Sequence, residues 1–295
     1  MKICLVDTRD QTRLSEAGAV YVSELAPALA EHHQVSVVTV GDRPHEQPAA
    51  GGAIRKVVER ERPDLVHLNN IAGLPLLTVM WAIGGHLPVA ASLHDGMLLR
   101  LPVDINRWLI SRVRLVISPT HSLLDRHLER GFFRQAIRQI VPYGIEAAPP
   151  PSARPHGGAF DVFFLDPSMS RDMRRARLQT ADCLVLPSRE PDQYLLTVQE
   201  ALQAGAVVIA GQAGGISEVI QSGVNGILVE AGDHAAIDAS IRQLHDDPVL
   251  ATRLRTAAAE TARHFDMRFH VAGLSDAYRQ LIRASRAGDL DRPAA

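Results

Sequence analysis

The distribution of apolar residues along the chain predicts a regular alternation of buried strands and amphipathic helices. Short unbroken apolar runs are typical of parallel strands covered on both faces. In the first half they lie at 3–6, 35–40, 65–68, 89–93 and 115–118, and a further run begins at 140. Helical periodicity fills the intervals, for example from Ala19 to Glu31. This order predicts an α/β domain with a parallel sheet and helices on both of its faces.

A segment rich in proline and glycine separates this half from a second strand–helix series. Residues 147–158 contain four prolines and two glycines, a composition typical of linkers. Further strands are predicted at 160–165, 183–186, 206–210 and 227–229. We therefore expect a first domain at 1–146, a linker at 147–158 and a second parallel-sheet domain at 159–266. A last helix at 267–283 and a frayed tail at 284–295 complete the prediction.

Composition excludes several classes of protein. A net charge of −2 and a pI near 6.7 argue against nucleic acid as a partner. Cys4 and Cys183 fall in predicted core strands, as expected of reduced thiols in a cytoplasmic protein. Histidines and cysteines show no metal-ligand spacing, so we expect no metal cofactor. The apolar stretch at 71–93 is interrupted by prolines and glycines, which predicts at most peripheral contact with a membrane.

The densest set of motifs lies at 181–233, where each predicted strand is followed by a loop. E-A-L-x-A-G occupies 200–205, G-G-x-x-E-V-I occupies 214–220, and G-x-N-G-I-L-V occupies 223–229. The strand at 183–186 ends in Pro187-Ser188. Ligands of open α/β sheets bind outside the carboxyl ends of the strands, where such loops gather. This stretch is therefore predicted to form half of a binding site.

These motifs and their spacings resemble the retaining glycosyltransferases of family 4, which have the GT-B fold. The match covers about fifty consecutive residues. Three pieces of the first half also resemble the family: Gly18 at the entry of the first helix, His94-Asp95 after the fourth strand, and P-x-G-I-E at 142–146. The resemblance implies two Rossmann-like parallel-sheet domains, of which the second is truncated, with the last helix crossing back to the first.

The resemblance also implies roles for single residues. His94 would line the reaction centre and hydrogen-bond the sugar, whereas its structural alternative is a histidine bonded to backbone. Glu200 would contact the ribose of the donor rather than lie on a solvated helix face. Asp192, eight positions earlier, would contact the sugar, although the family has the longer Glu there. Gly18 would let the backbone approach the donor phosphate.

Phosphate binding is the part of the site in which this chain departs from the family. Backbone N–H groups of Leu195, Leu196 and Thr197, at a helix start, suit a phosphate, and Arg189 lies nearby in the sequence. The family's Arg and Lys that bind the diphosphate have no counterpart, because two strand–helix units are missing before residue 160.

Arg154 and Arg171, or the Arg189 already named, are candidates to replace this missing clamp. The only lysines are Lys2 and Lys56. The four arginines at 171, 174, 175 and 177 are otherwise expected to form a solvated helix face.

The leading functional prediction is transfer of a sugar, with retention, from a nucleotide-sugar to a small-molecule or lipid/glycan acceptor. Such a site works by positioning and by stabilising charge on the leaving diphosphate, without a metal or other cofactor. The alternative is a degenerate, non-catalytic GT-B-like protein that acts as a binding or partner subunit. A dinucleotide oxidoreductase is disfavoured because no G-x-G-x-x-G follows the first strand. The sugar, base, acceptor and any homo- or hetero-oligomeric state stay open.

Overall fold

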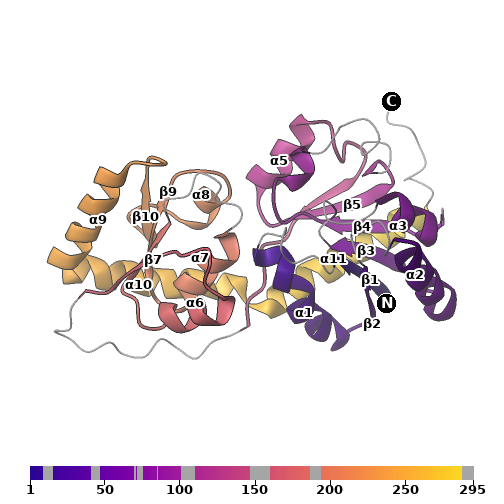
Figure 1. Ribbon diagram of the computed structural model, residues 1–295, viewed down its shortest axis with the longest axis horizontal. Coiled ribbons are helices and arrows are strands. Elements are labelled where there is room, and N and C mark those ends of the chain that lie inside the picture. The colour runs from indigo at the N-terminus through magenta and orange to yellow at the C-terminus, as the bar shows by residue number, and fades with distance from the viewer. Residues whose placement is uncertain are drawn as a thin grey trace. The chain divides into compact units, whose positions relative to one another are not determined.

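The computed structural model describes residues 1–8, 16–40, 47–69, 71, 76–84, 86–100, 110–146, 160–186 and 194–287. Residue contacts divide the chain into two units. The first comprises Met1–Pro142 with His270–Ala295, and the second comprises Tyr143–Phe269. Each unit has its own parallel sheet (Figure 1). The predicted linker at 147–158 lies outside the described residues.

The sheet of the first unit has six parallel strands in the order β2-β1-β3-β4-β5-β6. Their bounds are β1 Lys2–Thr8, β2 Gln34–Val40, β3 Leu65–Asn69, β4 Val89–Ser92, β5 Val113–Ser118 and β6 Ile137–Ile140. The apolar runs thus correspond to the strands, except that β6 ends at residue 140 instead of starting there. The strand order reverses between β1 and β3. This is the topological switch point at which open α/β sheets bind their ligands.

Helices cover both faces of this sheet. They are α1 Glu16–Ala30, α2 Gln47–Glu61, α3 Leu76–Ile83, α5 His121–Glu129 and α11 Met267–Arg286, with a 3-10 turn at Met97–Arg100. Side chains of successive strand residues point to opposite faces. Val66 and Leu68 of β3 therefore enter an apolar core that also contains Ile54 of α2 and Met80 of α3.

The opposite face of the strands is covered in part by α11. Its buried positions are His270, Val271, Leu274, Ser275, Ala277, Tyr278 and Leu281, a stripe with helical spacing. From His270 onward this helix belongs to the first unit. Tyr278 reaches His67 of β3 with its hydroxyl, 2.7 Å from Nδ1, which places the helix against the centre of the sheet. Among the described residues, no helix combines the length and apolar character needed to cross a membrane.

The second unit contains a four-stranded parallel sheet in the order β10-β9-β8-β7, the number of strands that the sequence predicts. The strands are β7 Val162–Phe164, β8 Cys183–Leu186, β9 Val207–Gly211 and β10 Gly226–Val229. The helices are α6 Arg171–Leu178, α7 Leu195–Gln203, α8 Ile216–Val219, α9 His234–Asp246 and α10 Pro248–Ala262, with a 3-10 turn at Arg263–Phe265. The two-sheet α/β fold is confirmed.

Local sequence signals fix the ends of these helices. Ser170 caps α6 and Asp233 caps α9, because each side chain accepts a hydrogen bond from a backbone N–H of the first turn. Pro248 opens α10 directly after its cap, Asp247. Gly205, two residues after α7, adopts φ +68°, the left-handed conformation that the sequence predicts at this helix end.

A pair of glycines tests the close packing of the second sheet. A Cβ added to Gly226 would lie 2.8 Å from the carbonyl oxygen of Val208, whereas a Cβ on Gly52, within α2, would meet no atom within 4 Å. Gly226→Ala should therefore lower the free energy of unfolding by about 1–3 kcal/mol. Gly52→Ala should raise it by about 0.5–1 kcal/mol. Urea titration of the two variants measures both values, and equal shifts for the pair would contradict the packing described.

Candidate active site

Polar side chains gather at the carboxyl edge of the first sheet, beside the switch point. Asp7 lies near the end of β1, Asn69 ends β3, and His94 follows β4 by two residues. Asn69 Nδ2 donates a hydrogen bond to Asp7 Oδ1 at 2.8 Å. His94 Nε2 lies 2.5 Å from Asn69 Oδ1. The histidine predicted to line the reaction centre is thus bonded to a side chain of the neighbouring strand, and not through Nε2 to backbone.

His94 is enclosed in the folded unit, with only 2% of its surface exposed. The ring of Tyr21, from α1, packs edge-on against it at 4.7 Å between centroids. Burial, with the nearby His67 and His270, lowers the pKa of His94 to about 3. The imidazole is therefore neutral at physiological pH, which suits a hydrogen-bonding group rather than a general acid.

A second set of buried polar groups joins the sheet to α11. His67 Nε2 lies 2.8 Å from Ser92 Oγ, and the Tyr21 hydroxyl bonds both Ser92 and His270 Nε2, the latter at 2.9 Å. His270 Nδ1 donates to the backbone oxygen of Pro142 at 2.6 Å. These groups satisfy one another in a dry interior, where an unbonded polar atom is costly.

Sequence reasoning missed most of this network. Asn69, His67, Tyr21, His270 and Tyr278 had no assigned role. His67 and Asn69 were readable as polar residues two apart in a strand, hence on one face. Tyr278 and His270 carry no comparable signal, since periodicity shows that they are buried but not what they contact.

In the second unit, the predicted donor acid lies in a buried ion pair. The side chain of Glu200, on α7, is 3% exposed. Its Oε1 accepts a hydrogen bond from Arg171 Nε at 2.8 Å and lies 2.7 Å from Arg171 Nη2. Arg175 Nε lies 3.7 Å from the same oxygen. The structure thus brings together two residues that the sequence assigned to separate tasks, ribose contact and phosphate clamp.

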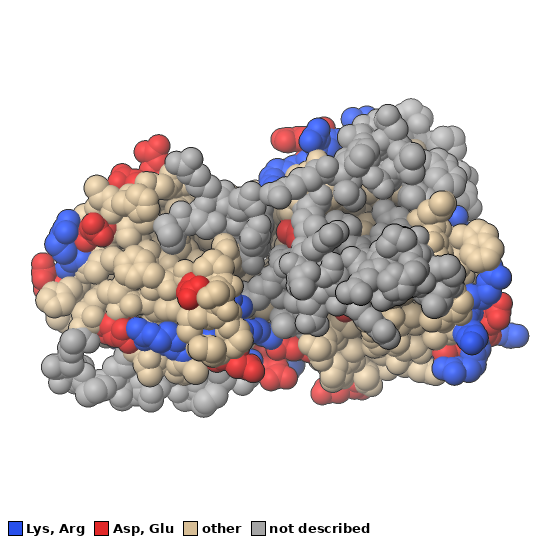
Figure 2. Space-filling view, viewed as in Figure 1, with Lys and Arg blue, Asp and Glu red and all other residues tan. Residues whose placement is uncertain are grey.

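The remaining arginines of α6 divide between interior and surface. In Figure 2, blue side chains, which in the second unit are all arginines, gather over α6. Arg174 is nevertheless only 6% exposed and donates to the Met169 backbone oxygen, so the prediction of a wholly solvated arginine face was wrong. The apolar part of a long arginine side chain packs readily against neighbours. Arg177 pairs with Asp161, away from Glu200.

The first turn of α7 contains the three residues whose backbone N–H groups the sequence predicts to bind phosphate. The side chains of Leu195, Leu196 and Thr197 are all buried, so these residues contribute to the core. Tyr194, at the N-cap, makes no side-chain cap hydrogen bond to their N–H groups. Whether these groups bind phosphate stays a prediction.

Other predicted site residues are not placed. Asp192, Arg189 and Arg154 lie outside the described residues. Gly18 lies in the first turn of α1, and the loop before that helix is not described.

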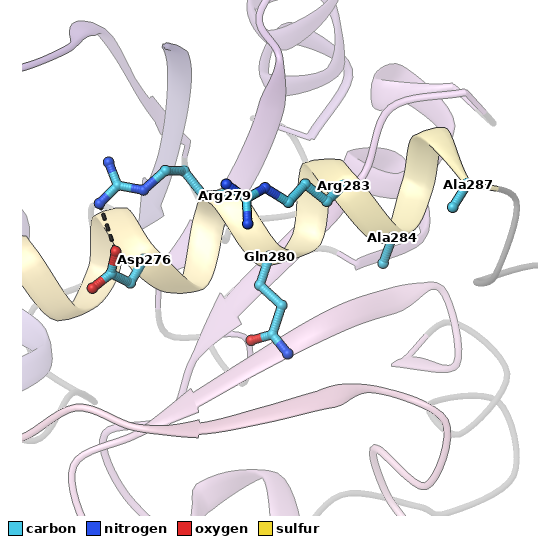
Figure 3. A pocket seen from close by; sticks show the side chains of 6 residues that line it. All are labelled: Asp276, Arg279, Gln280, Arg283, Ala284 and Ala287. Carbon is cyan, nitrogen blue, oxygen red and sulfur yellow. Dashed lines mark hydrogen bonds and ion pairs between the residues drawn. The ribbon is translucent and has the colours of Figure 1, made fainter.

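A surface pocket of about 560 Å³ lies elsewhere in the first unit. Five residues of α11 and Ala287, which follows it, line this pocket: Asp276, Arg279, Gln280, Arg283, Ala284 and Ala287 (Figure 3). Arg279 pairs with Asp276 at 2.6 Å, and Gln280 accepts from Gln139 of β6 at 2.7 Å. No candidate site residue borders this pocket.

Comparison with known proteins accounts for both halves of the chain. A family model described as Glycosyltransferase Family 4 matches residues 18–148, and one described as Glycosyl transferases group 1 matches residues 156–264. Together they cover about four fifths of the sequence, in the order expected of one protein.

The chain belongs to the family 4 glycosyltransferases. Among curated relatives, a D-inositol 3-phosphate glycosyltransferase of Streptomyces avermitilis is 31% identical over 129 residues, 44% of this chain and 28% of that protein. One from Catenulispora acidiphila is 36% identical over 108 residues, 37% of this chain and 26% of that protein. The chain therefore spans less than a third of the length of these two curated relatives.

Solved structures establish the fold of this family 4 chain. Anabaena HepE in complex with UDP and glucose superposes with a TM-score of 0.71 at 16% identity, covering 95% of this chain and 100% of that one. Sucrose-phosphate synthase from Thermosynechococcus elongatus gives 0.72 at 16% identity, covering 96% and 100%. Likeness at this identity shows a shared GT-B architecture.

Four buried histidines predict that mild acid unfolds the first unit. Burial lowers the pKa of His67 and His94 to about 3 and of His127 and His270 to about 4. In the unfolded chain they titrate near 6.5, so below that pH the unfolded state binds more protons. Their contribution to stability is complete above pH 6.5 and is lost as the pH falls toward 4. Each proton adds a slope of about 1.4 kcal/mol per pH unit.

Amide hydrogen exchange from pH 7 to 4.5 measures this loss. Protection of β3 and β4 should fall before that of β8 and β9, because the second unit holds none of the four histidines. His127→Gln, which removes one titrating group, should reduce the pH slope by about one proton. Simultaneous loss of protection in both sheets, or an unchanged slope in the variant, would contradict the assignment.

Proposed function

We propose that the chain transfers a glycosyl group from a nucleotide-sugar to a hydroxyl acceptor, with retention of the anomeric configuration. The observation that carries this proposal is the acid of the E-A-L-x-A-G motif, Glu200, buried at the donor side together with arginine partners. Membership of family 4 supplies the reaction class. HepE was solved with UDP and glucose, which supports a nucleoside diphosphate-sugar as donor.

The charge of this cluster suits a diphosphate. One carboxylate, Glu200, faces two guanidinium groups, Arg171 and Arg175, so the three side chains carry a net charge of about +1. Arginine binds phosphate oxygens through planar, charge-assisted hydrogen bonds. In this proposal α6 supplies the positive charge that the family's missing Arg and Lys supply elsewhere. Glu200 both holds Arg171 in place and accepts from the ribose.

In the first unit, His94 is the group that we propose to bind the sugar. As a neutral imidazole it hydrogen-bonds the sugar, and it neither protonates the leaving group nor attacks the anomeric carbon. Catalysis then rests on orientation and on charge stabilisation at the diphosphate, the two effects that do not require a protein nucleophile. No resident cofactor enters this scheme.

One observation favours the alternative, a non-catalytic binding protein. Glu200 is already ion-paired with Arg171, so a ribose must share or displace that contact. In this second scheme the pair is a structural link between α6 and α7, and nucleotide-sugars neither bind nor turn over.

Calorimetric titration with nucleoside diphosphates tests the cluster. We expect a Kd of about 0.1–1 mM for nucleoside diphosphate. The affinity is low because Arg171 and Arg175 are already paired with Glu200, whereas the family has an Arg and a Lys dedicated to the diphosphate. Arg171→Ala should weaken binding about tenfold or more, because one charge-assisted contact is worth about 1.5–3 kcal/mol. Arg177→Ala, on the same helix but paired with Asp161, is the matched control and should leave affinity unchanged.

Pyrophosphate separates the two roles of Glu200. Glu200→Gln should weaken nucleoside diphosphate binding about tenfold, because the ribose loses a charged acceptor. Pyrophosphate has no ribose, and Gln keeps the oxygen that accepts from Arg171, so pyrophosphate affinity should not fall. Equal weakening by Arg171→Ala and Arg177→Ala, or no binding of any nucleotide, would favour the non-catalytic scheme.

Turnover is then measured with a panel of nucleotide-sugars and hydroxyl acceptors. Inositol phosphate is a reasonable first acceptor, because the curated relatives carry that name. Release of nucleoside diphosphate that depends on both donor and acceptor supports the proposal. Donor binding without acceptor-dependent release across the panel would contradict it.

A further inference from the structure

Three side chains at the switch point form a hydrogen-bonded series from a carboxylate to an imidazole. Asp7 Oδ1 accepts from Asn69 Nδ2 at 2.8 Å, and Asn69 Oδ1 lies 2.5 Å from His94 Nε2. The register of β1 with β3 pairs Val6 with Leu68, so Asp7 and Asn69 are the next residues on adjacent strands. Asn69 in turn pairs with Ser92 of β4, two residues before His94. Strand register thus places the three side chains on one edge.

The direction of each hydrogen bond follows from the groups themselves. A carboxylate only accepts, so the Asn69 amide must present its NH₂ group to Asp7. Its oxygen then faces His94, and an amide oxygen also only accepts. His94 Nε2 must therefore carry a hydrogen and donate it to Asn69 Oδ1. In a neutral imidazole this makes Nδ1 the acceptor of the ring.

We propose that Asn69, oriented by Asp7, is a positioning residue that holds His94 as the Nε2–H tautomer with Nδ1 as its acceptor. The part that this tautomer plays in turnover rests on the proposed function, whereas the tautomer itself does not. Asn69 acts through His94 and contacts no reacting atom.

The Asn69 amide separates the carboxylate of Asp7 from the imidazole of His94, and this separation affects the charge of the ring. A carboxylate placed directly on an imidazole favours the charged, protonated ring. Asn69 passes on the orientation imposed by Asp7 but carries no charge to the ring. Burial and the neighbouring His67 and His270 act in the same direction, since all keep the ring neutral. The site therefore gains a fixed tautomer without gaining an acid.

Packing around the ring holds its plane. Tyr21 contacts the His94 ring edge-on, and the Tyr21 hydroxyl is itself bonded to His270 Nε2. Rotation of the ring would break the 2.5 Å contact with Asn69 in a site that is almost fully buried. Asn69 is 0% exposed, so bulk solvent does not reach this position to replace it as an acceptor.

Long-range ¹H–¹⁵N correlation of the histidine side chains in the full chain tests the proposal directly. At pH 7, His94 should show one protonated nitrogen, Nε2, whereas His270 and His127, which donate through Nδ1 to backbone oxygens, serve as opposite references. A His94 signal with the proton on Nδ1, or an imidazolium, would overturn the proposal.

Variants show whether Asn69 sets the tautomer. Asn69→Ala removes the acceptor and should give a mixed or inverted His94 tautomer. Asp7→Ala leaves Asn69 in place but frees its orientation, and it gives the same readout if Asn69→Ala fails to fold. Asn225→Ala is the matched control: Asn225 is a buried asparagine of the second unit with three hydrogen bonds, and its loss should leave the His94 signals unchanged. An unchanged tautomer in both Asn69→Ala and Asp7→Ala would sink the proposal.

Exchanging the residues at positions 7 and 69 separates the effect of a hydrogen-bond acceptor beside His94 from the effect of a negative charge there. In Asp7→Asn/Asn69→Asp the carboxylate touches His94 and accepts from Nε2, so the tautomer should be kept. The ring should now protonate at a higher pH, because a negative charge faces it directly. Loss of the Nε2–H tautomer in the swapped protein would mean that something other than the acceptor at position 69 selects it.

Kinetics tests the link to the reaction. With a donor that turns over, Asn69→Ala should lower kcat about tenfold or more while the donor KM changes less than about threefold. The swapped variant should recover part of the loss near neutral pH. A changed tautomer with unchanged kcat would overturn the positioning role. Absence of turnover in the unaltered protein would refute the proposed function instead, and the spectrum would still decide the tautomer.

Discussion

The first unit depends on one constraint, the need to satisfy polar side chains that are buried on a parallel sheet. His67, Asn69 and Ser92 lie on the face of the sheet opposite the apolar core that contains Val66 and Leu68. This face is covered by α1 and α11. An unsatisfied polar group there costs about 1–3 kcal/mol, so each requires a fixed partner. Tyr278 supplies the partner of His67 from 211 residues away in the sequence. The N-terminal sheet is therefore complete only when the last long helix of the chain has docked, although the entire second unit lies between them. Through His270, which bonds the Tyr21 hydroxyl beside the His94 ring, the same helix also supports the surroundings of His94.

In the second unit, a buried polar side chain is satisfied by charged partners instead of neutral ones. Glu200 is as buried as His94, but its partners are guanidinium groups of α6, which lie one strand–helix step earlier in the chain. Removing one member of a buried ion pair leaves the other uncompensated, and this explains why Arg171 and Glu200 are expected to act together. The first unit carries neutral hydrogen-bonding groups at the carboxyl ends of its strands, and the second carries a cluster of net positive charge around Glu200.

The fold could be predicted from the sequence because its signals are local. Buried parallel strands are unbroken apolar runs, and Ser170, Asp233, Pro248 and Gly205 mark helix ends by their own chemistry. His94 and Glu200 were found through motifs with fixed spacing. Their partners could not be found in this way. Asn69 reads as an ordinary polar residue at a strand end, and helical periodicity shows that Tyr278 is buried without showing that it faces His67. The arginines of α6 were taken for a solvated face because their long, charged side chains usually are one, and only the approach of α7 turns Arg171 inward. Partners set by tertiary packing carry no sequence signal of their own.

We propose that this chain catalyses glycosyl transfer by positioning and charge stabilisation, with a neutral His94, with no protein nucleophile and with no base that inverts the sugar centre. The anomeric configuration of the first product tests it most directly. Proton NMR of the glycoside product distinguishes the two anomers by the coupling of the anomeric proton. The account predicts the same anomeric configuration in the product as in the nucleotide-sugar donor. A product of opposite configuration would contradict it, since inversion requires a base that activates the acceptor on the far face of the sugar ring.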